Sequence, residues 1–579
     1  MNALILSLLL PLGLHAQVRN PGTYVMLESR SWFTFDPAAA NDAVSFIATG
    51  NVYEPLITFK SVGDPEGLMP FLASEVPSRE NGLISQDGLT YTFPVRKDVV
   101  FHSGDPLTPE DVRYSLLRFM LHDPQGGSAA LLLRPLLGLY STRDSQGNVV
   151  VDFAQADQAV QVQDDKVILR LKRLDNTFLK ILASLPIVVC RKWAVEHGEW
   201  DGTEAAFKRY NNRPLAESYL HEHMNGTGPF SLEKADAKAG ELSLKRNPRY
   251  WRDAAKLEQV LIRVVPCPAL RMTMLENGDA DSSYFEARDY YEVKELSGVR
   301  IAEGPGQTSG GEVVYFTFKA DPGAELLGSG RLDGKGIPPD FFSDAKVREG
   351  FAYALDYDAY LKRGLGGRGT RTQGPIPGCL CPSSKEKPRF AFDLGKAKKA
   401  FRAALGGRLW EQGFTVTLTY SPSNANRLVL AELLKEGVER LNPKFKVKVR
   451  AVTSQQLYSE AERHRLPVFI AGYYADYPDP HSYAFGMLHS SGYFPKAQRY
   501  ANPQVDALIE KAAGAASTAE RRDLYQEAVR LASGDVPQVY TFSPMLFQAG
   551  KDWVRGLDSD QNVSNLGLNR FPYFYVLSK

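Results

Sequence analysis

The tyrosine-flanked carboxylate of Asp476 is the group in this sequence best suited to chemistry. An apolar run over residues 466–471 predicts a buried strand that ends at Gly472, where the backbone can turn and a ligand can approach it closely. Three tyrosines surround the carboxylate: Tyr473, Tyr474 and Tyr477. Such a site suits a cationic group, because the charges pair while the rings exclude water and add cation–π attraction. The alternative is a tyrosine-rich turn in which Asp476 only caps a loop.

Patterns typical of catalysis are missing from the sequence. It contains no Gly-x-Ser-x-Gly elbow, no His-Glu-x-x-His helix and no Gly-x-x-x-x-Gly-Lys phosphate loop. His102, His481 and His489 have no partners at metal-ligand spacing. Asp476 and Asp479 could suggest a glycosidase carboxylate pair, but their spacing in a Pro-bounded loop does not define the geometry that this chemistry needs. We therefore expect a binding protein and no enzyme, with no catalytic residue, metal or cofactor.

Composition limits the class of protein. The 579 residues are too many for one core and predict two or three domains. Lys+Arg 68 against Asp+Glu 67 leaves no basic excess, so nucleic acid is not an expected partner. Four cysteines allow three complete pairings, and the sequence does not choose among them: Cys190, Cys267, Cys379 and Cys381.

The N-terminus carries an apolar run over residues 3–14, shorter than the ~20 residues that span a bilayer. With the small residue Ala16 behind it, the run predicts a secretory signal peptide over residues 1–16, although no Lys or Arg precedes it. The alternative is a frayed apolar N-terminus. Gln17 stands where a lipid-anchored protein would have cysteine. The mature chain is therefore expected in the periplasm, soluble and without a lipid anchor.

The periodicity of the later chain predicts an α/β fold. Alternating strands over 415–421 and 446–452 flank a helix over 426–441, a βαβ unit that implies a parallel pair. Amphipathic helices are predicted over 344–365 and 517–532, the second opening with a Ser517-x-x-Glu520 capping box. Thr108 is expected to cap a helix that starts at Pro109.

An ordered series of motifs extends across nearly the whole chain. It includes Asp36-Pro37, Tyr53-Glu-Pro-Leu56, Gly226-Thr-Gly-Pro-Phe230 and Ala475-Asp-Tyr-Pro-Asp-Pro480. The series resembles family 5 of the bacterial extracellular solute-binding proteins, the peptide-binding proteins of ATP-binding-cassette (ABC) importers. The resemblance implies an α/β fold of the type II periplasmic-binding-protein kind, with two lobes, a hinge and an extra inserted domain.

The resemblance also implies that the segments 259–265 and 537–542 cross between the lobes as the hinge. We accordingly predict a discontinuous domain I over residues 17–58, 196–267 and 539–579. An inserted domain II is predicted over 59–195, and domain III over 268–538.

Ligand contacts follow from the same resemblance. In similar proteins, an Asp in the motif matched by Ala475-Asp476-Tyr477 binds the α-amino group of an extended peptide, and an aromatic residue at the place of Tyr473 packs beside it. This implies a site containing Asp476 and Tyr473, with Gly472 and Tyr474 next to them. The loop of Asn41, Asp42 and Ala43 aligns without a gap with a ligand-touching loop, although the identities differ.

The carboxylate end of a peptide would need a cation. Arg368 and Arg371 are candidates because they lie in a Gly-rich run before Pro375, and Arg463 and Arg465 are equal rivals. The alternative for each is a solvated surface charge.

The expected function is therefore the capture of di- or oligopeptides by a monomeric protein that delivers them to the permease subunits of an ABC importer. Two kinds of alternative remain open. The same fold could bind a nickel complex, glutathione, haem or an oligosaccharide, or the chain could be an extracellular hydrolase with a dispersed site.

Overall fold

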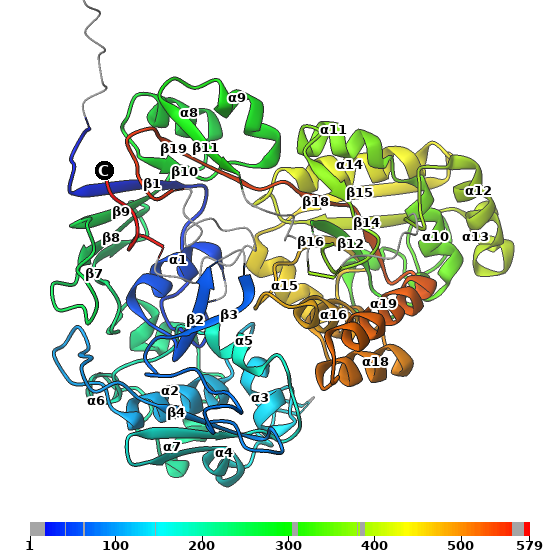
Figure 1. Ribbon diagram of the computed structural model, residues 1–579. Coiled ribbons are helices and arrows are strands. Elements are labelled where there is room, and N and C mark those ends of the chain that lie inside the picture. Colours follow the sequence, from blue (N-terminus) through cyan, green and yellow to red (C-terminus); the bar gives the residue numbers. More distant parts are fainter. Residues whose placement is uncertain are drawn as a thin grey trace, which may run out of the picture.

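The computed structural model describes residues 18–40, 42–61, 64–144, 146–303, 311–378, 380–381, 388–557 and 573–579 (Figure 1). The predicted signal peptide, Asn41 and Cys379 lie outside these ranges. Within them, no helix is both long and apolar enough to cross a membrane.

Lobe 1 is built on a seven-stranded mixed sheet of order β11-β19-β10-β1-β9-β8-β7. Its strands are β1 (Thr23–Glu28), β7 (Phe230–Asp236), β8 (Glu241–Arg246), β9 (Gln259–Val264), β10 (Ser282–Ser283), β11 (Val299–Glu303) and β19 (Phe547–Lys551). The central strand β1 pairs in parallel with β9 and β10. The helices of this part of the chain are α1 (Ala43–Val52), α8 (Pro268–Glu276) and α9 (Tyr290–Lys294).

The segment predicted as an inserted domain over 59–195 begins with β2 at Ile57, lies below lobe 1 in Figure 1 and shares one continuous hydrophobic core with it. We refer to residues 57–195 as the inserted domain. It contains the hairpin β2 (Ile57–Ser61) and β3 (Asp64–Pro70) and a sheet of β4 (Thr90–Pro94), β6 (Lys166–Arg170) and β5 (Val160–Gln163). Its helices are α2 (Pro109–His122), α3 (Ala130–Leu137), α4 (Phe153–Ala159), α5 (Phe178–Ala183) and α6 (Arg191–Glu196), and α7 (Glu204–Tyr210) packs against α2 and α4 (Figure 1). The predicted cap of α2 is confirmed, since Thr108 and Asp111 form a complete capping box.

Lobe 2 is built on a five-stranded sheet of order β15-β14-β16-β12-β17. Its strands are β12 (Glu312–Phe316), β14 (Phe414–Tyr420), β15 (Phe445–Ala451), β16 (Val468–Gly472) and β17 (Gln538–Tyr540). The predicted βαβ unit is confirmed, because β14 and β15 are parallel and α14 (Asn426–Glu439) connects them. Two short strands, β13 (Gly369–Arg371) and β18 (Phe542–Pro544), pair beside this sheet.

Helices surround the sheet of lobe 2. They are α10 (Ala345–Ala354), α11 (Tyr357–Leu365), α12 (Leu394–Ala403), α13 (Arg408–Gln412), α15 (Ser454–Glu462), α16 (Pro480–Leu488), α17 (Tyr493–Gln498), α18 (Pro503–Ala513) and α19 (Thr518–Asp535). The helix predicted over 344–365 is two helices, because Leu355 is extended and Asp356 caps a new helix by accepting from the Ala359 N–H. Ser517 caps α19 as predicted, by accepting from the Glu520 N–H. The second half of the predicted capping box does not form, because the Glu520 side chain accepts from the Ala516 N–H and not from that of Ser517.

The boundary between the lobes differs from the predicted one at residue 268. Cys267 and Pro268 follow β9, but Pro268 is the first residue of α8, and the chain after α8 returns to the same sheet as β10 and β11. The segment 259–265 is therefore an internal strand of lobe 1 and does not cross to lobe 2. The chain passes to lobe 2 between β11 and β12. It returns between β17 and β19, by the red segment of Figure 1.

Candidate functional site

The strand that leads to Asp476 is buried as predicted. β16 lies between β12, with which it is antiparallel, and β14, with which it is parallel. Its residues from Val468 to Ala471 are fully buried, and Gly472 at its end is half-buried. A Cβ atom at Gly472 would lie 3.1 Å from an Oε1 atom of Glu312, so a side chain would crowd the neighbouring strand. The close packing at Gly472 thus fixes where the chain turns away from the sheet after β16.

Asp476 is held in place by its neighbours. The Tyr473 hydroxyl donates to Oδ2 of Asp476 at 2.9 Å, and the Asp476 N–H donates to Oγ of Ser482 at the same distance. Burial and the nearby Asp476 charge raise the pKa of Tyr473 well above its usual value, so this hydroxyl stays a donor. The half-buried carboxylate therefore has a defined orientation before any ligand arrives.

The three tyrosines of the motif have different environments. Tyr473 packs edge-on against Tyr483 and orients Asp476. Tyr477 is buried in the core, where its hydroxyl lies 2.8 Å from Nδ1 of His481. Tyr474 is exposed over 46% of its surface. Of the three, Tyr474 is the ring with the most surface left for a ligand.

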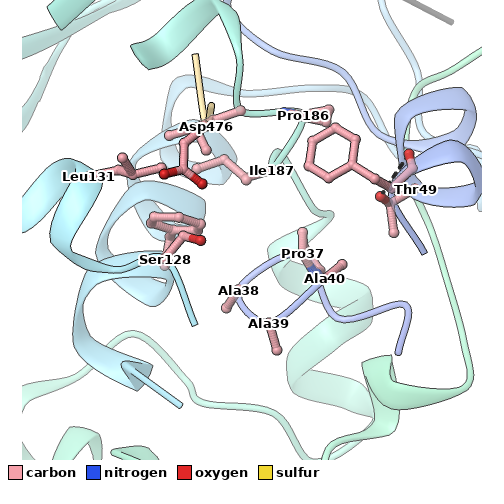
Figure 2. A pocket seen from close by; sticks show the side chains of 13 residues that line it. Pro37, Ala38, Ala39, Ala40, Thr49, Ser128, Leu131, Pro186, Ile187 and Asp476 are labelled. Atoms are coloured by element: carbon pink, nitrogen blue, oxygen red, sulfur yellow. Dashed lines mark hydrogen bonds between the residues drawn. The ribbon is translucent and has the colours of Figure 1, made fainter. Parts of the chain in front are cut away.

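Asp476 faces a small cavity at the meeting point of lobe 1, the inserted domain and lobe 2 (Figure 2). The cavity has a volume of about 50 Å³. Its other lining residues are Pro37, Ala38, Ala39, Ala40, Phe46, Thr49, Phe119, Ser128, Leu131, Leu185, Pro186 and Ile187. A cavity of this size holds a few water-sized groups, so a peptide could enter only if the lobes moved apart.

A buried ion pair fixes the lobe 1 side of the cavity. Arg118 on α2 donates to both carboxylate oxygens of Asp36, each at 2.6 Å, and to Glu199 at 3.0 Å. Asp36 in turn accepts from the N–H of Ala38 at 3.0 Å. Burial alone would raise the pKa of Asp36, but the Arg118 guanidinium outweighs it and holds the pKa well below its usual range. The loop of residues 37–40 is therefore anchored to the inserted domain.

Asp42 and Ala43 of the predicted loop lie next to this wall, and Asn41 lies outside the described residues. Asp42 caps α1, because its side chain accepts from the Ser45 N–H at 3.0 Å, and Ala43 is the first residue of that helix. Neither residue lines the cavity, whereas Phe46 and Thr49 on α1 do. Ligand contacts from Asp42 and Ala43 stay a prediction.

The candidate arginines lie away from the cavity. Arg371 donates to the carbonyl of Thr541 at 2.7 Å and stacks over Tyr357 at 3.6 Å. Arg368 stacks over Tyr290 at 3.4 Å and pairs with Glu303. Arg463 is exposed at the end of α15. Among the described residues that line the cavity none is cationic, so a role for any of these arginines at the ligand stays a prediction.

Asp479 joins the inserted domain to lobe 2. It is fully buried and accepts from Arg521 on α19 at 2.8 Å and from Lys180 on α5 at 3.1 Å. Burial opposes ionisation, but these two cations lower the pKa of Asp479 below its usual value. Asn176 adds a second link by donating to the carbonyl of Ala515 at 2.7 Å. Asp479 thus forms an interdomain ion pair, and it does not line the cavity that Asp476 faces.

The sequence prediction missed the apolar wall of the cavity. Leu131, Leu185 and Ile187 come from the inserted domain, more than 280 positions before Asp476 in the sequence. The apolar run at 185–189 was visible in the sequence, but such runs ordinarily indicate core. Only the packing of the inserted domain against both lobes brings these residues to Asp476.

Other reactive groups form no second site in the described ranges. Cys190, Cys267 and Cys381 are free thiols. No group of three or more His, Cys, Asp or Glu side chains is placed to hold a metal ion in the part of the chain that the structure describes.

Two mixed sheets on separate lobes, with the carboxylate of Asp476 facing a cavity at their meeting point, define a two-lobed binding protein. The chain belongs to the bacterial extracellular solute-binding proteins, family 5, whose model for the middle region matches residues 67–495. The predicted fold class and family are confirmed by this match.

Relatives in this family share modest identity with the chain. It is 26% identical over 541 residues to heme-binding protein A of Haemophilus influenzae, covering 90% of this chain and 87% of the relative. It is 22% identical over 558 residues to the dipeptide-binding protein DppE of Bacillus subtilis, covering 94% and 91%. Among solved structures, the periplasmic binding protein DppA of Helicobacter pylori in complex with the peptide STSA superposes with a TM-score of 0.74. That superposition covers 96% of this chain and 98% of DppA at 20% identity, which shows a shared fold.

Proposed function

We propose that the protein captures a peptide with a free α-amino group between its two lobes and delivers it to an ABC importer. The observation that carries the proposal is the oriented carboxylate of Asp476, which faces a cavity bounded by both lobes. A ligand ammonium group there would pair with Asp476 and would be shielded from water by the surrounding apolar side chains. The peptide-binding relatives support peptide as the solute.

We also propose that the two lobes close around the bound ligand. The segment between β18 and β19, where the chain returns from lobe 2 to lobe 1, acts as a hinge, and a ligand that touches both lobes favours the closed state by its higher affinity for it. Membership of an extracellular family supports secretion after cleavage of residues 1–16, and the proposal places the mature protein in the periplasm as a monomer. Its partners are then the permease subunits of the importer.

Calorimetric titration tests the proposal. Tri-alanine and tetra-alanine are titrated into the purified protein beside glutathione, haem and a nickel–histidine complex. We expect the alanine peptides to bind and the recovered peptide to be chemically intact, as for a carrier and unlike a hydrolase. Binding of haem, glutathione or the nickel complex in place of both peptides would refute the peptide assignment.

A further inference from the structure

Positive charge is concentrated in one segment of lobe 2. Residues 394–450 contain twelve Lys and Arg but four Asp and Glu, whereas the whole chain contains 68 and 67. The segment runs from α12 through α13, β14 and α14 to β15. In Figure 1, α12 and α13 lie at the end of lobe 2 that is farthest from lobe 1. A local excess of this kind in a chain of balanced charge indicates an anionic partner at this end of the molecule.

Four lysines of this region surround a hollow of about 480 Å³ at the outer edge of the lobe 2 sheet. Lys446 and Lys448 are exposed on β15, which is the edge strand. Lys435 is half-buried on α14, and Lys335 is exposed in the loop before α10. The residues that line this basic hollow are Gly334, Lys335, Thr415, Lys435, Glu439, Lys446, Val447 and Lys448.

The lysines of the basic hollow are not neutralised by neighbouring acids. None of the four forms an ion pair with a residue that the structure describes. Glu439, the acid among the lining residues, accepts from the Val447 N–H at 2.9 Å and so covers part of the exposed strand edge. Asp333 accepts from the backbone N–H of Lys335 at 2.9 Å and from the Ser329 hydroxyl at 2.8 Å. The hollow therefore keeps a net positive charge.

Protection of the strand edge accounts for only part of this charge. Lysines on an edge strand prevent it from pairing with another chain, which would explain Lys446 and Lys448. Lys335 and Lys435 lie outside the strand and line the same hollow. The convergence of lysines from three separate segments therefore requires a further explanation.

Further cations lie next to the start of β15. On α12, the cationic groups of Lys398 and Arg402 lie 5.6 and 4.9 Å from the centre of the Trp410 ring. Trp410 packs edge-on against Phe445, the first residue of β15. Lys398 and Arg402 are exposed, so they extend the positive surface beyond the hollow.

The basic hollow lies at the opposite end of the sheet from the ligand site. Thr415 and Lys446 pair near the start of β14 and β15. β16 is parallel to β14 and pairs with its last residues, so Gly472 lies at the other end. Lys446 and Lys448 are exposed although the two lobes are in contact at the cavity beside Asp476. Contact between the lobes therefore leaves this surface accessible.

We propose that the basic hollow and the cations around it bind the phosphate groups of an anionic phospholipid surface and so hold the protein reversibly at a membrane. The ammonium groups pair with lipid phosphates, while the hydrocarbon stems of the lysines line the hollow. The inference goes beyond the proposed function, and it suits a carrier that meets its permease at a membrane. Each cation near such a surface strengthens binding about fivefold.

Co-sedimentation with lipid vesicles tests the inference. Vesicles of phosphatidylcholine alone are compared with vesicles of phosphatidylcholine and phosphatidylglycerol in equal parts. We expect binding to the anionic vesicles only. This binding should weaken as the salt is raised from about 0.01 to about 0.1 M, because the Debye length falls from ~30 to ~10 Å. Equal binding to both kinds of vesicle, or none to the anionic vesicles at low salt, would overturn the inference.

A free anion is the other source of phosphate groups. Calorimetric titration with pyrophosphate separates the two sources. Binding of pyrophosphate by a protein that does not bind anionic vesicles would assign the hollow to a soluble anion and would overturn the membrane proposal.

Removal of charge from the hollow tests its role in the vesicle binding. Lys446→Gln combined with Lys448→Gln should weaken binding to the anionic vesicles about 25-fold, at about fivefold for each charge. Lys238→Gln combined with Lys245→Gln is the matched control, because both lysines are exposed on lobe 1 and form no ion pair with a described residue. Wild-type vesicle binding by the first pair variant, or an equal loss in the control, would overturn the inference.

Two further measurements keep the result interpretable. Circular dichroism and thermal unfolding check the fold of each variant. Should the strand variant fail to fold, Lys335→Gln combined with Lys435→Gln removes the same charge outside the edge strand, and its unchanged vesicle binding would overturn the inference. Vesicle binding is measured without peptide, so a failure of the proposed function does not affect this result.

Discussion

Replacing Asp476 with asparagine removes the charge of the site and keeps its shape. The amide oxygen of asparagine can still accept from the Tyr473 hydroxyl, and the backbone bond to Ser482 does not involve the replaced group. Any loss of affinity then reports the charge itself. The ligand ammonium would be enclosed without its counter-charge, which costs ~2–5 kcal/mol for a buried pair.

The magnitude lies at the lower end of that range. Asp476 is only half-buried, so solvent screens part of the interaction. A loss of about 2 kcal/mol corresponds to roughly 30-fold weaker binding, since ~1.4 kcal/mol is one decade. We expect this loss for peptides with a free N-terminus and little loss for N-acetylated peptides, which carry no charge there.

Calorimetric titration of both peptides into both proteins gives the four affinities of a double-mutant cycle. Asp523→Asn is the matched control, because it removes the same charge from an exposed position of lobe 2. If free and acetylated peptides lose affinity equally on Asp476→Asn, the carboxylate only shapes its loop and the reasoning is refuted.

Three further predictions concern closure, acid sensitivity and export. Lys180→Met removes the partner of Asp479 from the inserted domain and leaves Arg521 in place. We expect peptide affinity to fall by a few-fold, and small-angle scattering to show a smaller decrease of the radius of gyration on ligand binding. Wild-type values for both would contradict a role of the Lys180–Asp479 pair in closure. Burial opposes ionisation of Glu510, but His489, Tyr140 and Arg173 lower its pKa to about 2. The folded pKa lies below the ordinary value of 4.5, so the stabilisation is present above pH 4.5 and is lost as the pH falls toward 2. Denaturant unfolding should show that the difference in unfolding free energy between wild type and Glu510→Gln becomes smaller as the pH falls from 4.5 toward 2. A constant difference would contradict a stabilising role of the Glu510 carboxylate. N-terminal sequencing of the protein from the cell-envelope fraction of its host should find a new N-terminus after Ala16, and an intact Met1 there would contradict cleavage.

Local patterns predicted the parts of the fold that depend on local physics. The alternation of 415–421 and 446–452 fixed the two strands of the βαβ unit, because each strand buries one face. The caps at Thr108 and Ser517 were equally readable, since a capping side chain bonds backbone only a few residues away.

The lobe boundary could not be predicted in this way. A proline after a strand can end a domain or begin a helix, and the residues around Pro268 do not distinguish the two. Sheet membership of β10 and β11 depends on pairing with β19, some 250 residues further on. Such pairing leaves no local signal.

The same distinction between local and long-range interactions applies to the candidate site. Asp476 was predictable because its strand and its tyrosines are adjacent in sequence. The environment of Arg371 was not, since its stacking on Tyr357 and its bonds to the 540–541 backbone come from tertiary packing. The apolar cavity wall also depends on how three separate parts of the chain meet.

The most direct test of the central claim is a crystal structure of the protein with a bound peptide. The account predicts closed lobes, with the ligand α-amino nitrogen about 2.7–2.9 Å from a carboxylate oxygen of Asp476, as for a charge-assisted hydrogen bond. A peptide bound between the lobes with no ligand nitrogen within hydrogen-bond distance of Asp476, or bound elsewhere on the molecule, would contradict it.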